Sequence, residues 1–448
     1  MKTLLLTIDA WRASHASFMP DSVGEYTPNL AEFADDGAVF TQAVSHGPAT
    51  PYAFPSIFTS TLPLDYGGYE QLSADRTLVS EPLNHAGWRC VGVHANPWLG
   101  EKYGYGRGYA DYRDVGEFGL PGLERGRQFL LSNFSLDSPV YRGVQYLYRS
   151  LQTPLRMVTG DAAEIEVARD ALAEAQGNTF VWTHLLEPHA PYTPPKRHRE
   201  AIGVPETDDS PAQLVTRAQH NPEKFTERER EVIRGLYAAS VRHADEKVGT
   251  LLEAVDDDTL VIVTADHGEA LFDHGQVGHE PCLYDELLHV PLLVRPPSGA
   301  EEGTIDTQVR HIDIAPTILD YAGVAVPDSY RGQSLRPAIE GEGLDTELAV
   351  SEVASSATEP GRLDSDALQV GVRTPARKLV YADGAVEGFD LEADPEERDP
   401  LTELEGEEWE ALRGALDDRL AAIEVGDTGD IERDEEVQQR LRNLGYID

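Results

Sequence analysis

Apolar residues along the chain form two patterns: short continuous runs, and longer stretches in which they recur every three or four positions. The short runs predict buried strands, and the periodic stretches, such as residues 161–175, predict helices. A capping box of Thr226 and Glu229 begins a long helix that extends to about residue 255. The main runs are residues 3–8, 38–44, 89–94, 179–184, 260–264 and 290–294. Because strands and helices alternate, we expect an α/β fold with a large, mostly parallel sheet flanked by helices on both faces.

The pattern changes after about residue 345, where four short strands follow one another closely and precede a helical stretch at 407–423. The strands are expected at 348–353, 368–373, 378–381 and 386–391. They predict a small antiparallel sheet with a helix beside it. We therefore expect a main α/β domain over residues 1–345, with an insertion at about 100–160, and a small C-terminal α+β subdomain over 346–448 that ends in an acidic tail.

The composition excludes several classes of protein. Of 448 residues, 37 are Lys or Arg and 79 are Asp or Glu, so the formal charge is −42, which repels nucleic acid. Cys90 and Cys282 are the only cysteines, which excludes a disulfide framework and a Cys-rich zinc site. No apolar run approaches the roughly 20 residues of a membrane-spanning helix, and the N-terminus lacks the features of a signal peptide. We expect a cytoplasmic protein without a transmembrane segment.

Lysine is scarce among the basic residues. The lysines are Lys2, Lys102, Lys196, Lys224, Lys247 and Lys378. A dense carboxylate surface with few lysines predicts a halophilic protein, because multimolar salt shortens the Debye length to about 3 Å or less and screens self-repulsion. An ordinary acidic protein is the alternative.

Residues 126–157 reverse this charge balance, with four arginines against the single acid Asp137 and with interleaved aromatic residues. Such a segment fits contact with a membrane surface, a lipid-linked substrate or a partner subunit. The alternative is a packed lid whose arginines pair with neighbouring acids. The four arginines are Arg127, Arg142, Arg149 and Arg156.

Polar residues at the ends of the predicted strands are the candidates for chemistry, because ligands bind at the carboxyl ends of strands in open α/β sheets. Asp9 ends the first strand, and Asp266 and His267 end a later one. Carboxylate oxygens and imidazole nitrogens suit a divalent ion. Further candidates near the same edge are His184, Glu187, His189 and His279.

Seven segments occur in the order found in one known family. They are LTIDAWR at 6–12, TPNLAEFADDGAVF at 27–40, EPHAPY at 187–192, TADHGE at 264–269, DIAPTIL at 313–319, FDLEADPE at 389–396 and RLRNLGY at 440–446. Through these segments the chain resembles the sulfatase branch of the alkaline phosphatase superfamily over nearly its whole length. The resemblance implies that residues 1–345 form a catalytic domain that hydrolyses sulfate esters with the help of a metal ion.

The position of the nucleophile departs from the best-known sulfatases, which convert a Cys or Ser in a C/S-x-P-x-R motif to formylglycine. Residues 56–59 resemble the family's SLxTG segment and place Thr50 at the nucleophile, with Phe54 in place of the Arg. Neither cysteine is nearby, so formylglycine is not expected. Thr nucleophiles occur among phosphodiesterases and phosphotransferases of the superfamily. Alternatively, Thr50 caps a helix that begins at Pro51.

The resemblance implies one bound divalent ion, which is Ca, Mn or Zn. The family has a second aspartate after the first, and this chain has Ala10 at that position. The expected ligands are Asp9, Thr50, Asp266 and His267. A second metal near Glu187, His189 and His279 stays open. Both lysines with which many sulfatases bind sulfate are missing: residues 91–96 contain none, and His279 occupies the later position.

The expected reaction is attack of Thr50 on sulfur or phosphorus, with His189 or His279 protonating the leaving alcohol. A hydrolase of sulfate esters is the first hypothesis, and the substrate is an anionic ester on a glycan or lipid. A phosphodiesterase, a phosphonate hydrolase or a phospho-group transferase of the phosphoethanolamine or lipoteichoic-acid type is the second. A non-catalytic binding protein on the same fold is the third.

Overall fold

The computed structural model describes residues 1–116, 163–297, 299–300, 303–345, 348–355 and 362–423. The segment 126–157, the acidic tail and the signature at 440–446 lie outside the described residues. None of the helices in the described ranges combines the length and the apolar composition needed to cross a membrane.

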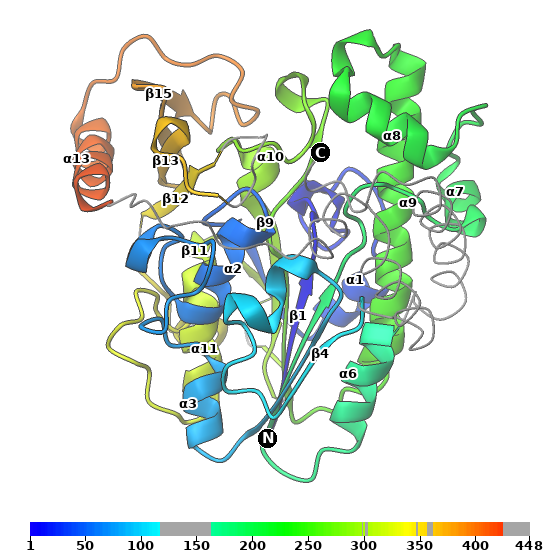
Figure 1. Cartoon of the computed structure of the whole chain (residues 1–448), viewed down its shortest axis with the longest axis vertical. Coiled ribbons are helices and arrows are strands. Elements are labelled where there is room, and N and C mark those ends of the chain that lie inside the picture. The colour runs from blue at the N-terminus through cyan, green and yellow to red at the C-terminus, as the bar shows by residue number, and fades with distance from the viewer. Residues whose placement is uncertain (117–162, 298, 301–302, 346–347, 356–361, 424–448) are drawn as a thin grey trace, which may run out of the picture.

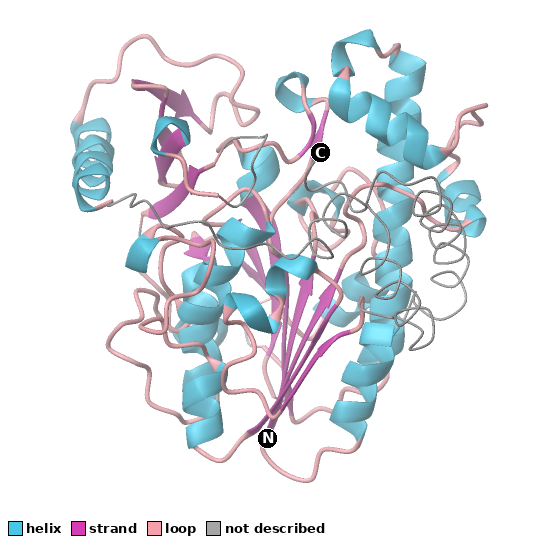
Figure 2. Ribbon diagram, viewed as in Figure 1, coloured by secondary structure: helices cyan, strands magenta, loops and turns pink. Residues whose placement is uncertain are grey.

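A nine-stranded, mostly parallel sheet forms the centre of the molecule (Figure 2). Its strands are β1 (Lys2–Ile8), β2 (Ala38–Val44), β3 (Arg89–His94), β4 (Asp111–Asp114), β5 (Thr179–Leu185), β6 (Thr259–Ala265), β9 (His289–Arg295), β10 (Thr304–Ile305) and β11 (Val309–Arg310). The spatial order is β10-β2-β9-β6-β1-β5-β3-β4, and β11 also pairs with β2. β9 is antiparallel to both of its neighbours, β2 and β6. The predicted large, mostly parallel sheet is therefore confirmed.

Helices cover both faces of this sheet (Figure 1). One face carries α2 (Thr50–Thr59), α3 (Ser80–His85) and α11 (Ile314–Tyr321). The other carries α1 (Pro28–Ala34), α6 (Ala163–Ala173) and α9 (Glu227–Leu252). The remaining described α-helices of the main part are α7 (Lys196–Ile202), α8 (Pro211–His220), α10 (Asp285–Leu288) and α12 (Arg336–Ile339).

The long helix α9 begins where its capping box predicts. The Thr226 hydroxyl accepts a hydrogen bond from the Glu229 backbone N–H, and the Glu229 carboxylate accepts one from the Thr226 N–H at 2.9 Å. These two bonds satisfy backbone donors that a helix start otherwise leaves open.

The register of the central strands sets the position of the site. β1 lies between β5 and β6, and Ile8 pairs with Leu185 on one side and with Ala265 on the other. All three strands run in the same direction, so the residues that follow them emerge at one edge of the sheet. Asp9 and Asp266 therefore come together although they are far apart in the sequence. The backbone N–H of Ala10, next to Asp9, bonds Asp266 across 256 positions.

A separate four-stranded antiparallel sheet follows, as predicted. It consists of β12 (Ala349–Ala354), β13 (Leu368–Arg373), β14 (Arg377–Ala382) and β15 (Ala385–Asp390), in that spatial order. The helix α13 (Glu407–Ala422) covers it, packing Trp409, Leu412 and Leu416 against Val370 and Leu379. The domain boundary at about residue 345 stays a prediction.

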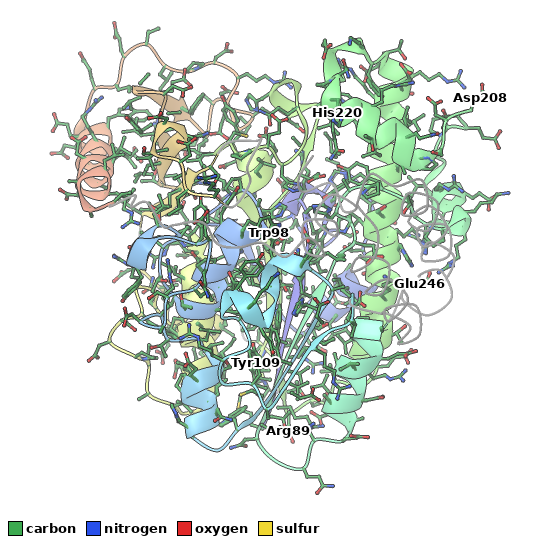
Figure 3. The ribbon with its side chains drawn as sticks, in the orientation of Figure 1. Arg89, Trp98, Tyr109, Asp208, His220 and Glu246 are labelled. Carbon is green, nitrogen blue, oxygen red and sulfur yellow. The ribbon has the colours of Figure 1, made fainter. Side chains whose placement is uncertain are left out.

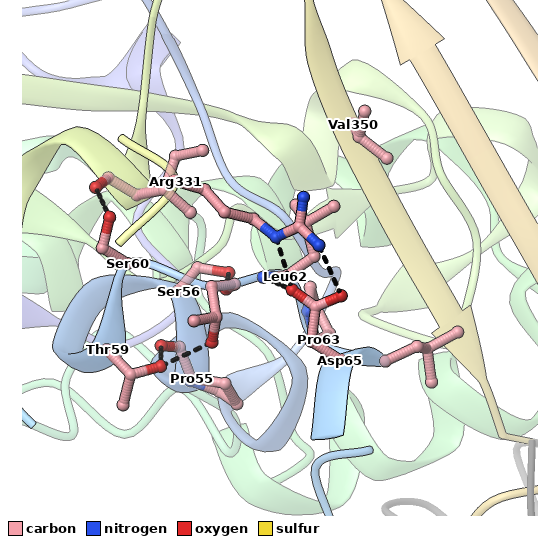
Figure 4. Close-up of polar contacts among 12 residues, drawn as sticks. Pro55, Ser56, Thr59, Ser60, Leu62, Pro63, Asp65, Arg331 and Val350 are labelled. Carbon is pink, nitrogen blue, oxygen red and sulfur yellow. Dashed lines mark hydrogen bonds and ion pairs between the residues drawn. The ribbon is translucent and has the colours of Figure 1, made fainter. Parts of the chain in front are cut away.

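Buried ion pairs join this second sheet to the loop that follows α2. Arg419 of α13 donates two hydrogen bonds to Glu352 of β12 and one, at 2.9 Å, to Asp65. Arg331 also donates two bonds to Asp65, at 2.7 and 3.2 Å (Figure 4). The loop at the end of α2 is thus held by charges from two distant parts of the chain.

Candidate active site

Two fully buried aspartates and a histidine converge at the carboxyl ends of β1 and β6. The Nε2 atom of His267 lies 3.4 Å from Oδ1 of Asp9 and 3.6 Å from Oδ2 of Asp266, and all three side chains are buried. The backbone N–H of Ala10 donates to Oδ1 of Asp266 at 3.2 Å, which fixes that carboxylate against the end of β1.

The donor set fits a divalent ion. His267 donates its Nδ1–H to the Gly268 carbonyl at 2.7 Å, so its Nε2 faces the two carboxylates. Ligand atoms about 2.0 to 2.4 Å from one ion lie roughly 3 to 3.5 Å apart, close to the distances observed. Burial disfavours the imidazolium, yet Asp266 and Asp9 raise the pKa of His267 to about 9, so the pocket attracts positive charge. Asp9, Asp266 and His267, with Thr50 beside them, are the residues that would hold the ion.

Thr50 is the first residue of α2, and its hydroxyl points into this cluster. Oγ1 donates to Oδ2 of Asp266 at 2.8 Å, and the side chain is fully buried. The N-cap of α2 is Ala49, and no side chain caps the helix. The alternative that Thr50 serves as a helix cap is therefore wrong, because its hydroxyl is engaged by Asp266.

His184 also reaches the site, although the predicted ligand set omits it. Its Nε2 lies 3.2 Å from Oδ2 of Asp9, and its Nδ1 lies 2.9 Å from the hydroxyl of Thr7, the residue with which it pairs across β1 and β5. Asp9, His184 and Asp266 form one group with metal-ligand spacing. The strand register brings His184 to the site, because it pairs His184 with Thr7, two positions before Asp9 and on the same face of the strand.

Asn96 also reaches the site, although it is not among the candidates named from the sequence. It follows β3, and its side-chain Nδ2 donates to Oδ2 of Asp9 at 3.0 Å and to Oγ1 of Thr50 at 3.3 Å. Figure 3 labels its neighbour Trp98 near the centre of the molecule, whereas Arg89, at the start of β3, lies at the opposite end of the strand. Asn96 is thus at the same sheet edge as the aspartates.

Both predicted catalytic histidines lie beside the cluster. The ring of His279 has its centroid 4.7 Å from that of His267 and 4.8 Å from that of His189. His189 donates its Nδ1–H to the Ala190 carbonyl at 2.6 Å, and the Nδ1 of His279 lies 2.8 Å from Oε2 of Glu269. These contacts hold both imidazoles in fixed orientations.

Glu187 does not join them as the second-metal hypothesis supposed. Its Oε1 lies 2.8 Å from the Lys247 ammonium of α9, and although burial opposes ionisation, Lys247 lowers the pKa of Glu187. The carboxylate beside His279 is Glu269, which is fully buried and also accepts a hydrogen bond from Tyr192. His267, Glu269 and His279 form the second group with metal-ligand spacing.

Comparison with known proteins places this geometry in a family. A family model described as Sulfatase matches residues 2–324, and one described as N-sulphoglucosamine sulphohydrolase, C-terminal, matches residues 273–425. The chain is 32% identical to an N-acetylglucosamine-6-O-sulfatase of Bacteroides thetaiotaomicron over 170 residues, 36% of this chain and 30% of that protein. It is 26% identical to an ulvan-active sulfatase of Formosa agariphila over 446 residues, 94% of this chain and 80% of that protein.

Several curated relatives are matched over only part of their length. The matched regions span about a third of the N-acetylglucosamine-6-O-sulfatase and of two arylsulfatases K, between 30% and 38%. Among solved structures, a phosphonate monoester hydrolase of Agrobacterium radiobacter superposes with a TM-score of 0.70 at 20% identity, covering 97% of this chain and 99% of that one. That likeness concerns the fold.

Proposed function

This chain belongs to the sulfatase family, and on that basis we propose that it is a metal-dependent hydrolase of sulfate esters that uses Thr50 as its nucleophile. One observation carries the proposal: the buried Thr50 hydroxyl donates to Asp266 where Asp9 and His267 converge. Formylglycine is not expected, because Thr50, and neither a cysteine nor a serine, begins α2 at the position of the nucleophile.

Each residue of the site has a separate role in the proposed reaction. A divalent ion held by Asp9, Thr50, Asp266 and His267 would lower the pKa of the Thr50 hydroxyl and offset charge on the ester oxygens. Oδ2 of Asp266 already accepts the Thr50 hydrogen bond and is aligned to take its proton. The bond from Oγ1 to sulfur forms, the bond from sulfur to the alcohol oxygen breaks, and His189 or His279 protonates that oxygen. Water then hydrolyses the ester on Thr50.

The start of α2 adds a favourable field at this point. The ten-residue helix begins at Thr50, so its positive N-terminal end faces the nucleophile and the anionic ester. This field supports attack by an alkoxide on an anion.

The names of the relatives support a sulfated saccharide as substrate. An N-acetylglucosamine-6-O-sulfatase and an ulvan-active sulfatase are among them. We extend that class to this chain as a sulfated glycan, with a sulfated or phosphorylated lipid as the alternative.

A phosphodiesterase, a phosphonate hydrolase or a phospho-group transferase is the second candidate. The observation in its favour is the nucleophile itself, an unmodified threonine whose hydroxyl bonds Asp266. Lysine is missing from both family positions, at residues 91–96 and at His279, so the site suits monoanions better than dianions.

The test is a set of kcat/KM measurements in molar KCl on protein supplied with Ca²⁺, Mn²⁺ or Zn²⁺. The substrates are 4-nitrophenyl sulfate, bis(4-nitrophenyl) phosphate, 4-nitrophenyl phenylphosphonate and 4-nitrophenyl phosphate. We expect one of the three monoanions to be turned over fastest. A phosphate monoester favoured by more than about tenfold, or ~1.4 kcal/mol, would contradict the one-metal proposal. No turnover of any ester would favour a non-catalytic binding protein.

A further inference from the structure

The Asn96 amide has one orientation that its surroundings permit. Its side chain is fully buried, and Oδ1 accepts a hydrogen bond at 3.0 Å from the Trp98 backbone N–H, at the start of a 3-10 helix over Pro97–Leu99. A flipped amide would set two donors against each other there and an oxygen against the Asp9 carboxylate. The NH₂ group therefore faces the site.

Both hydrogens of that NH₂ group have acceptors in the site. One bond runs to Oδ2 of Asp9 at 3.0 Å and the other to Oγ1 of Thr50 at 3.3 Å. The Thr50 hydrogen is directed at Oδ2 of Asp266, 2.8 Å away. The Thr50 oxygen thus accepts from Asn96 and donates to Asp266, which fixes the direction of its hydroxyl.

We propose that Asn96 is a catalytic residue that stabilises the Thr50 oxygen as it loses its proton to Asp266 and attacks the ester. The proposal rests on the proposed role of Thr50 as nucleophile. An N–H donor binds an oxyanion roughly twice as strongly as a neutral hydroxyl, so the contact is stronger while the Thr50 oxygen carries negative charge, before its bond to sulfur is complete, than in the resting enzyme. Interactions that strengthen in this way accelerate chemistry rather than binding.

Asn96 also caps the 3-10 helix. The test must therefore separate the loss of this cap from the loss of the donor to Thr50. Asn96→Asp and Asn96→Ser both keep a side-chain oxygen that can accept from the Trp98 N–H, and both lose the NH₂ group that reaches Thr50. Asn96→Ser does so without adding charge beside Asp9. The matched control is Asn29→Asp on α1, since Asn29 donates at 2.7 Å to a carboxylate of Asp245, away from the site.

The experiment measures kcat and KM on 4-nitrophenyl sulfate and bis(4-nitrophenyl) phosphate, metal content by elemental analysis, Tm, and the mass of the Thr50 ester in acid-quenched samples. We expect both Asn96 variants to lose about 10²- to 10³-fold in kcat and to form the Thr50 ester correspondingly slowly, the effect typical of losing one oxyanion donor. KM and metal content should stay near those of the wild type. Asn29→Asp should keep wild-type kcat.

Two results would overturn the proposal: wild-type kcat in Asn96→Ser, or a fall in activity that matches a fall in metal content, which would mean that Asn96 acts only through Asp9. Thr50→Ala in the same assay separates this failure from failure of the proposed function. Wild-type turnover in Thr50→Ala would contradict the assignment of Thr50 as the nucleophile. If Thr50→Ala is inactive and Asn96→Ser is fully active, the proposal for Asn96 is contradicted and the role of Thr50 is not.

Discussion

At the scale of single residues, the Thr50 hydroxyl decides whether the site can form a covalent ester. Thr50→Ala should abolish turnover, and Thr50→Ser should keep part of it, because serine retains the attacking oxygen. Since Thr50 caps no helix, the alanine variant loses the hydrogen bonds that Thr50 makes with Asp266 and Asn96, and about 2 kcal/mol of stability. Measurements of kcat/KM and of thermal unfolding check both parts. Wild-type rates in Thr50→Ala would refute the assignment.

The ligand residues should fail in a different way. Asp266→Asn and His267→Ala should lose bound metal and activity together, because a divalent ion needs deprotonated ligands to stay bound. Glu187→Gln is the control: its carboxylate faces Lys247, so this variant should lose stability but keep its metal. Elemental analysis of the three variants distinguishes these outcomes. Full metal content in both ligand variants would remove them from the coordination set.

Residues at strand ends were predictable from the apolar runs, whereas several residues in loops were not. Asp9 and Asp266 follow directly from apolar runs, which fix where parallel strands end. Asn96 and Glu269 enter the site through loops after β3 and β6, whose paths depend on contacts far along the chain. Glu187 shows the same limit, since nothing local reveals that Lys247 of α9 binds it.

At the scale of elements, local pattern located the strands but not their order. The expected strands at 38–44, 89–94 and 368–373 coincide with β2, β3 and β13. For β2 and β3, continuous apolar runs work as a signal because a sheet covered on both faces buries nearly every residue of its strands. The antiparallel insertion of β9 between β2 and β6 depends on long-range packing, which no local pattern encodes.

The ion pairs between α13 and the loop after α2 allow a prediction about the free energy of unfolding. Arg419 bonds Glu352 and Asp65, and Arg331 also bonds Asp65, so Arg419→Met leaves the buried Glu352 carboxylate without its cation while Asp65 keeps Arg331. We expect a loss of about 3–5 kcal/mol in the free energy of unfolding, typical of breaking a buried ion pair from one side. Arg413→Met, an exposed position on the same helix, is the control and should change little. Urea denaturation measures both, and equal effects would contradict the assignment.

A second element-scale prediction concerns pH. Burial raises the pKa of Glu397 to about 7, from an ordinary value near 4.5, although Lys378 lies 2.8 Å away. Between these values the folded protein holds a proton that the unfolded chain releases, so this group's contribution to stability falls as pH rises from about 4.5 to 7 and is constant above. Glu397→Gln should remove that slope, and the exposed Glu396→Gln should not. Measuring the free energy of unfolding of both variants across this pH range tests the prediction. An unchanged slope in Glu397→Gln would show that Glu397 is not the group responsible.

At the scale of the whole molecule, acidic residues gather on exposed faces of the described elements. The outer face of α13 carries exposed Glu407, Glu408, Glu410, Asp417 and Asp418, while its apolar face covers the second sheet. Charges this dense repel one another across the surface and oppose compaction. A net charge of −42 therefore makes the fold depend on the ionic strength around it.

Salt should stabilise the protein steeply, and the shape of the dependence identifies the cause. The Debye length falls from about 10 Å at 0.1 M salt to about 3 Å at 1 M, so repulsion between neighbouring carboxylates is largely screened by about 1 M. We expect Tm to rise with KCl, with most of the gain below about 1 M and little above it. Sucrose at matched osmolality is the control, because it strengthens burial by exclusion without screening charge. A continued rise well beyond 1 M KCl, matched by sucrose, would point to solute exclusion, and a Tm indifferent to KCl would make this an ordinary acidic protein despite its six lysines.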